Sequence, residues 1–226
     1  MVRRIFLTAL IAGTVAGLFA AVVQRIQIIP LIERAEVYEA AETHHAGHAG
    51  LPGPQSWEPE AGLERTAYTV LADILTGIGF ALLLTGVIAL ASFSGVVVDV
   101  RRGLLWGAAG FAVFALAPSL GLPPSLPGMA GAELVQRQTW WVGTAIATAA
   151  GLGLIVFRPM PVFWVIGVAL LILPHAIGAP EVSESGGGVP PELAARFVIA
   201  SILAAGLFWL LLGGMSGWLY RRLDRA

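Results

Sequence analysis

Apolar and polar stretches alternate six times along the 226-residue chain. A helix needs about 20 predominantly apolar residues to cross the hydrocarbon core of a membrane, and most of the apolar stretches approach that length. The pattern predicts transmembrane helices at residues 5–23, 64–91, 104–117, 137–157, 162–177 and 197–220, of which the third is short. We therefore expect an all-α fold, a polytopic membrane helix bundle of about six transmembrane helices.

Composition supports this interpretation. The chain is 57% hydrophobic and 12% charged, whereas soluble domains carry about 25% charged residues. Residues 1–226 are expected to form a single integral membrane domain. The Met-Val-Arg-Arg start followed by an apolar run also fits a signal peptide, but no small-x-small cleavage site follows, so we expect a first span.

The basic residues predict the orientation. All thirteen are arginine, and cytoplasmic loops of membrane proteins carry the excess of Lys and Arg. In a six-span topology eight fall on the side of the termini: Arg3, Arg4, Arg101, Arg102, Arg158, Arg221, Arg222 and Arg225. Four fall on the other side, at Arg34, Arg65, Arg137 and Arg196, and the thirteenth, Arg25, lies within the end of a span. Both termini are therefore expected in the cytoplasm, and residues 32–65 form an extracytoplasmic loop.

This outer loop is rich in carboxylates and imidazoles, which would concentrate cations at the outer mouth. Its candidate metal ligands are Glu33, Glu36, Glu39, His44, His45 and His48. Oxygen and nitrogen donors suit divalent first-row metals, and a thiolate site is excluded because the chain has no cysteine. The histidines are expected to capture metal transiently; alternatively, they form a low-complexity tract without fixed geometry.

Asp73 is the only acid in the middle of a predicted span. It shares a helical face with Thr66, Thr69 and Thr76, because positions 66, 69, 73 and 76 are spaced by three, four and three residues. An ionisable side chain there costs about 2.5–3.5 kcal/mol on insertion scales, so Asp73 should face the bundle and have a partner. Two interpretations stay open, namely a structural bond to Arg137 or a threonine, and a cation pathway.

His175 follows Pro174 near the end of the fifth span. Proline in a helix frees a backbone carbonyl one turn earlier, and membrane ion sites are often built at broken helices. His175 is therefore a candidate to join Asp73 and a loop glutamate, since both lie at comparable depth. The alternative is a hydrogen-bonded structural histidine. Arg137, Trp140 and Trp141 open the fourth span and are expected to have a structural or gating role.

Glycines recur on two spans. Gly103, Gly107 and Gly110 lie on the third, and Gly213 and Gly217 on the sixth. Small residues at such spacing let a neighbouring helix approach closely in a membrane.

Enzymatic functions find no support. The chain has no His-Glu-x-x-His motif, no second membrane aspartate, and no Walker or dinucleotide motif. We therefore expect no enzyme, no permanently bound cofactor and no nucleic-acid partner. A driving force would come from an ion gradient, the membrane potential or a partner.

Several motifs together resemble a known family. They are Pro30-x-x-Glu33-x-x-Glu36-Val-Tyr38-Glu39, TAYTVLADILTGIGFALLL after Arg65, LAPSLGLPPSLPG with RQTWW from Arg137, and Leu173-Pro174-His175-x-x-Gly178-Ala179-Pro180. The chain is similar over nearly its whole length to the CbtA family of probable cobalt transporter subunits.

The resemblance implies a bacterial inner-membrane protein linked to cobalamin and cobalt supply. It also implies a small single-span partner, CbtB, with histidines near a terminus. Glu33, Glu36, Glu39 and His175 lie in the matching motifs. The family is usually described with five spans, whereas the hydrophobic pattern here predicts six.

The expected function is uptake of a divalent transition metal, with cobalt and the partner inferred from the resemblance alone. The metal would be the substrate, captured by the outer loop and passed along Asp73, His175 and a glutamate. Two alternatives remain: a membrane scaffold or metal-delivery subunit that does not itself transport, and metal efflux. Membrane lipid surrounds the bundle in each case, and a homo-oligomer is compatible with all three.

Overall fold

The computed structural model describes residues 1–45, 59–60, 62–93, 95–181 and 188–224, with side chains described outside 39–45. Every regular element in these ranges is helical. The α-helices are α1 (Val2–Val23), α2 (Ile29–His45), α3 (Leu63–Phe93), α4 (Val100–Phe111), α5 (Ala117–Ser119), α6 (Leu134–Phe157), α7 (Pro161–Ile177) and α8 (Pro191–Arg222). Two π-helical turns, η1 (Gln24–Ile28) and η2 (Ala112–Leu116), join α1 to α2 and α4 to α5 without a break.

Five continuous helices in the described part of the chain are long and apolar enough to cross a membrane. They are Val2–Tyr38, Leu63–Phe93, Val100–Ser119, Leu134–Phe157 and Pro191–Arg222. The sixth, α7, has 17 residues and is about 25 Å long at 1.5 Å per residue. The predicted all-α polytopic bundle is confirmed, and the third span is longer than its sequence pattern indicated.

Each π-turn ends two residues before a proline, and its C-cap residue directly precedes that proline. Ile29 precedes Pro30, and its N–H bonds to the carbonyl of Gln24; Ala117 precedes Pro118 and bonds to Ala112. Proline has no N–H, and its ring clashes with the carbonyl four residues earlier. Widening the turn by one residue lets the helix continue past each proline. The helix therefore runs on to His45, so the first part of the predicted outer loop is helical.

Glycine contacts join the helices in three close pairs. A Cβ at Gly17 of α1 would lie 2.6 Å from Ile74 Cα of α3, and one at Gly213 of α8 would lie 2.6 Å from Gly107 Cα of α4. A Cβ at Gly151 of α6 would lie 2.7 Å from the Gly167 carbonyl oxygen of α7. Only glycine fits at these positions, because a side chain would push the two helices apart.

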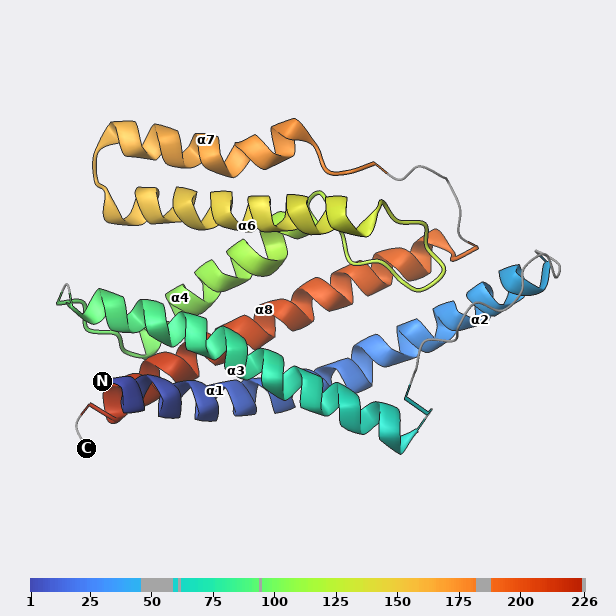
Figure 1. The fold of residues 1–226 in the computed structure, drawn as a ribbon, viewed down its shortest axis with the longest axis horizontal. Helices are drawn as coiled ribbons and strands as arrows, with labels where there is room; N and C mark the ends of the chain where they lie inside the picture. Colours follow the sequence, from blue (N-terminus) through green and yellow to red (C-terminus); the bar gives the residue numbers. More distant parts are fainter. Residues whose placement is uncertain (46–58, 61, 94, 182–187, 225–226) are drawn as a thin grey trace.

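The pairs are arranged around α8, which packs against α1, α3 and α4. Figure 1 shows α6 and α7 side by side along one flank, with α1 and α3 on the opposite flank. Helix α6 is the main neighbour of α7, and it contacts the rest of the bundle mainly through η2 and α5. As a result, α7 lies on the far side of α6 from α3.

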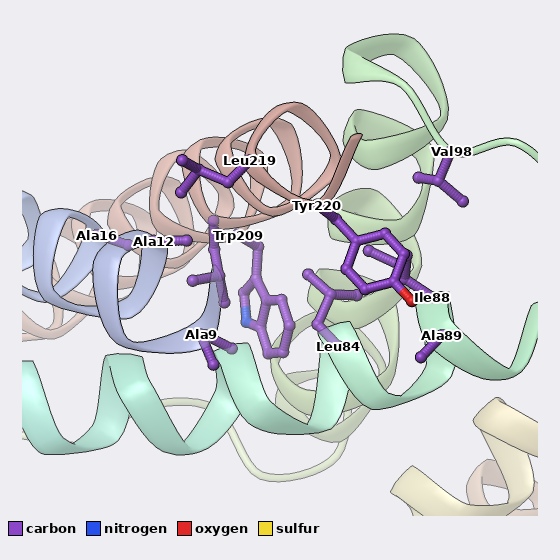
Figure 2. Packing of buried hydrophobic residues seen from close by; sticks show 12 residues of the cluster. Ala9, Ala12, Ala16, Leu84, Ile88, Ala89, Val98, Trp209, Leu219 and Tyr220 are labelled. Atoms are coloured by element: carbon purple, nitrogen blue, oxygen red, sulfur yellow. The ribbon is translucent and has the colours of Figure 1, made fainter. Parts of the chain in front are cut away.

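The main core lies where α1, α3 and α8 meet. Figure 2 shows Ala9, Ala12 and Ala16 of α1 beside Trp209, which extends from α8 toward α3. Small alanines on α1 leave room for this indole, which is 4% exposed. Aromatic rings continue the core, since Phe114 stacks on Trp209 with a 5.5 Å centroid separation.

Both termini lie at one end of the bundle (Figure 1). Arg4 of α1 donates to the carbonyl oxygen of Tyr220 at 2.6 Å, stacks on the Tyr220 ring, and pairs with Asp224. Asp99, between α3 and α4, approaches Arg221 at 4.0 Å at the same end. These contacts bring the first and last helices together at that end of the bundle.

Candidate functional site

The clearest polar feature within the bundle is the contact between Asp73 and Gln24. Gln24 Nε2 donates to Asp73 Oδ1 at 2.9 Å. The other carboxylate oxygen, Oδ2, is buried and has no hydrogen-bond partner among the described residues. The bond joins α3 to the end of the first span, and half of the carboxylate remains unsatisfied. The partner is Gln24 rather than the expected Arg137 or a threonine.

The π-turn η1 carries Gln24, and Gly17 sets the separation of the two helices. Because η1 adds one residue to the turn before Pro30, it changes which side chains face α3. Two turns earlier, the backbone of Gly17 packs on Asp73 and Ile74. Close backbone packing at Gly17 thus brings the amide of Gln24 within hydrogen-bonding distance of Asp73.

A cavity of about 330 Å³ opens beside this contact, here named the Asp73 cavity. Its polar lining residues are Gln24, Asp73, Thr76 and Ser201, and its aromatic ones are Phe80, Phe114, Phe208 and Trp209. Asp73 is the only charged residue among those that line it. The volume accommodates several waters, each of which occupies about 30 Å³ in the liquid. An apolar cavity with a few convergent polar groups is the usual form of a ligand site.

A second cavity, here named the Arg137 cavity, has a volume of about 600 Å³ and lies between η2, α6 and α8. It shares Phe114, Ala115, Ser201 and Ala205 with the Asp73 cavity, so these residues separate the two spaces. Arg137 is the only charged residue in its lining. The two cavities therefore differ in the sign of their charge.

His175 lies elsewhere. Its ring is edge-on to Trp140 of α6 at a centroid distance of 5.9 Å, and Trp140 Nε1 donates to the carbonyl oxygen of Pro174 at 3.3 Å. These contacts bind α7 to α6. The structure does not bring His175 together with Asp73, because equal depth in two helices does not make the helices neighbours.

The candidate glutamates of α2 are also apart from Asp73. Glu36 accepts a hydrogen bond from Arg65 at 2.8 Å, and Glu33 is exposed. The side chains of Glu39, His44 and His45, and all of His48, lie outside what the structure describes. Within the described residues no three His, Asp or Glu side chains gather into a group that holds a metal ion. The expected shared shell of Asp73, His175 and a described glutamate is therefore absent in this structure.

Sequence reasoning missed Gln24 and Ser201. The predicted first span ends at residue 23, so Gln24 falls just outside it, and the signal that could have placed it is Pro30, six residues later. A proline inside a continuing helical pattern indicates a π-turn or kink just before it. Ser201 has no comparable signal, since its place in the cavity depends on which face of α8 meets η2.

Comparison with known proteins decides the family. The sequence profile described as "Probable cobalt transporter subunit (CbtA)" matches residues 2–221. The chain belongs to the CbtA family. Neither the curated proteins nor the solved structures that were searched contain a match.

Membership places this chain among probable cobalt transporter subunits, and the five long apolar helices of the described residues, together with the shorter α7, fit a multi-pass membrane protein. The word "subunit" implies that it acts with partner proteins. A transporter-subunit family is also consistent with the absence of enzyme motifs in the sequence.

The Asp73 cavity is chemically suited to a cation. Asp73 supplies a carboxylate with one free oxygen, and the Gln24 amide adds an oxygen once its N–H groups are engaged. Co²⁺ accepts both oxygen and nitrogen donors. Two protein groups do not complete a coordination shell, so an ion held there would keep most of its waters.

Proposed function

We propose that the chain mediates uptake of a divalent transition metal ion, cobalt by family, across the bacterial inner membrane, and that the Asp73 cavity is the intramembrane step. Both termini would lie in the cytoplasm. The observation that carries the proposal is Asp73 Oδ2, a buried carboxylate oxygen without a partner that lies beside a cavity. A passing cation would offset this charge, whereas an empty cavity leaves it unpaired at a cost of several kcal/mol.

The outer end of the bundle would capture the metal. Glu33, Glu36, Glu39, His44, His45 and His48 are the proposed capture residues. The exposed Glu36–Arg65 ion pair contributes at most about 1 kcal/mol to stability, so an arriving divalent ion can replace Arg65 as the partner of Glu36. Removing the histidines should weaken capture without abolishing transport.

His175 and its neighbours are proposed to act through packing. Pro174, Trp140 and His175 form the contact that binds α7 to α6. Trp141 and Arg137 line the other cavity. On this proposal His175 lies beside the metal path, not on it.

The partners follow from the family. A small single-span subunit resembling CbtB is the proposed protein partner, with lipid around the bundle, and a homo-oligomer is compatible with the fold. No cofactor is proposed to stay bound, because the metal is the substrate.

A second candidate function is a scaffold or metal-delivery subunit that does not transport by itself. The Gln24–Asp73 bond favours this function, because the bond holds the first two spans together. A scaffold would need the bond for helix packing even if no metal passed through the bundle. Efflux would use the same cavity in the opposite direction.

Reconstitution into vesicles tests these alternatives. The chain, alone or with its single-span partner, is placed in liposomes that contain a cobalt indicator, with Co²⁺ outside and the potential negative inside. Such a potential favours entry by about 2.3 kcal/mol per charge per 100 mV. We expect Asp73→Asn to slow entry by about tenfold or more, because a bond to a charged group contributes about 1.5–3 kcal/mol.

His175→Ala and Asp99→Asn are the matched controls, since both residues lie away from the Asp73 cavity, and both variants should transport at near wild-type rates. Size-exclusion chromatography confirms that each variant is folded. If the Asp73→Asn variant transports at the wild-type rate, the proposed site is wrong. If the wild-type chain does not transport metal even with its partner, the result supports the scaffold function. Release from Co²⁺-loaded vesicles without entry indicates efflux.

A further inference from the structure

The Arg137 cavity has a polar end and an apolar end. Arg137, Gln138, Ser119 and Ser125 line it near the 120–133 connection, and a Cβ at Gly131 in that connection would lie 3.1 Å from Arg137 Nη1. Val142 lies five residues further along α6, about 7–8 Å deeper at 1.5 Å per residue. The deeper wall is apolar, made by Val142 with Phe114 and Ile202.

The charge at the polar end is unmatched. No acidic side chain lines the cavity, and no ion pair to Arg137 is present among the described residues. Glu133, one turn earlier on α6, caps the helix without a side-chain hydrogen bond and does not reach Arg137. A partly buried guanidinium offers five N–H donors in a fork that fits a phosphate or carboxylate group.

The cavity lies between two spans that make little direct contact. Helix α8 packs on α1, α3 and α4, and α6 packs on α7, so η2 and α5 bridge the space between α6 and α8. Leu134, Gln138 and Val142 form an exposed strip of α6 along the cavity. In a membrane such a space between spans is open to lipid, and a guanidinium at its end fits the phosphate of an anionic headgroup.

We propose that the Arg137 cavity binds one anionic phospholipid. Its phosphate is held by the guanidinium of Arg137 with the hydroxyl of Ser125, and an acyl chain lies along Phe114, Val142 and Ile202. The occupant fills the space between α6 and α8 and so fastens the α6–α7 pair to the rest of the bundle. This inference is independent of metal transport, because it concerns the other cavity.

Lipid retention measures the site directly. Full-length protein purified in mild detergent from membranes containing phosphatidylglycerol is analysed by native mass spectrometry. We expect wild type to retain one phosphatidylglycerol, and Arg137→Gln to retain about tenfold less because the charge-assisted bonds are lost. Arg137→Lys should retain an intermediate amount, since it keeps the charge without the fork.

Arg196→Gln is the matched control. Arg196 is an exposed arginine at the same end of the bundle, and it lines a different cavity together with Glu192. Its substitution should leave retention unchanged. Equal losses in both variants would show general attraction to anionic lipid and overturn the proposal.

A second measurement needs no arginine variant. The part of the tryptophan fluorescence lost in Trp141→Phe reports on Trp141, which lines the cavity. In nanodiscs, brominated phosphatidylglycerol should quench this component several-fold more than brominated phosphatidylcholine. Equal quenching by the two lipids contradicts the proposal. Displacement of the retained lipid by millimolar inorganic phosphate would assign the site to a free anion instead.

Discussion

Two of the aspartates, Asp73 and Asp99, show how the surroundings decide what a carboxylate does. Asp99 lies outside the membrane spans at the start of α4, where its side chain accepts the Arg102 N–H at 3.0 Å and faces Arg221. Asp73 lies within a span and has one amide partner for two oxygens. A carboxylate that caps a helix N-terminus and faces an arginine is structural. Asp73, which lines a cavity and has one oxygen without a partner among the described residues, is the residue on which the proposed metal step rests.

The pKa of Asp99 leads to a prediction about pH. The Arg102 backbone N–H, and then the charges of Arg221 and Arg102, lower the pKa of Asp99 below its ordinary value of 3.8. A lowered folded-state pKa stabilises the protein above the unfolded value, and this contribution is lost as pH falls through the folded value. Asp99→Ala should therefore lower the melting temperature in detergent at pH 7 by a few degrees.

Asp99→Asn separates the helix cap from the charge. Asparagine caps a helix about as well as aspartate, so this variant should lose less stability than Asp99→Ala at pH 7. Its difference in melting temperature from wild type should shrink as pH falls below 3.8 and through the lower folded-state pKa of Asp99, where the wild-type carboxylate becomes protonated. A difference that stays constant from pH 7 to pH 3 would show that the charge contributes nothing.

At the scale of elements, glycine faces and prolines determine how the helices meet. Gly103 and Gly107 of α4 contact Gly213 and Gly217 of α8 through bare backbone. Prolines at positions 30 and 118 are each preceded by a π-turn, and both π-turns contribute to the lining of the Asp73 cavity. The glycine contacts thus pack α4 closely on α8, whereas the π-turns before the two prolines widen the helices and leave the Asp73 cavity in the bundle.

Two glycines of α8 provide a matched pair for testing this packing. A Cβ at Gly213 would lie 2.6 Å from Gly107 Cα, a backbone atom that cannot move aside alone, whereas a Cβ at Gly206 would meet the Phe111 ring at 3.7 Å. Gly213→Ala should destabilise the protein by about 1–3 kcal/mol through overpacking.

Gly206→Ala should be neutral or slightly stabilising, because alanine favours a helix over glycine by about 1 kcal/mol. Thermal unfolding in detergent compares the two variants. Equal stability of both would show that α4 and α8 do not meet at Gly213 as described.

At the scale of the whole molecule, the bundle consists of helix pairs with the α6–α7 pair on one flank. Figure 1 shows the termini and the turn between α6 and α7 at the same end, so α7 runs back along the length of the bundle. With 17 residues, α7 is at the short end of the range for a membrane span. If the chain crosses the membrane six times, Arg158 and Glu181 lie on opposite sides. If it crosses five times, with α7 on the membrane surface, they lie on the same side.

Cysteine labelling tests this topology, and the chain has no native cysteine to remove. In intact spheroplasts a membrane-impermeant maleimide should label Glu181→Cys, and should label Arg158→Cys only after permeabilisation. Ser125→Cys and Arg222→Cys serve as references for the two ends. Labelling of Glu181→Cys and Arg158→Cys from the same side would show that α7 does not cross.

The sequence by itself determined the properties that depend on single segments. Hydrophobic length predicted the helices, and the small residues at 103, 107, 213 and 217 predicted close helix contacts. Both properties are local, because the free energy of transferring a segment into lipid and the size of a glycine do not depend on which helix is the neighbour. Asp73 could be singled out for the same reason, since a charge inside a span is costly wherever the span lies.

Only the tertiary structure decided which side chains meet. Depth along a helix follows from residue number, but lateral neighbours follow from the packing of faces, and that packing separates Asp73 from His175. Close backbone contact at Gly17, with the π-turn before Pro30, brings Gln24 to Asp73 instead, and η2 adds Phe114 to the wall of the cavity. The carboxylate could be found from the sequence, whereas its partner and its cavity are products of helix packing.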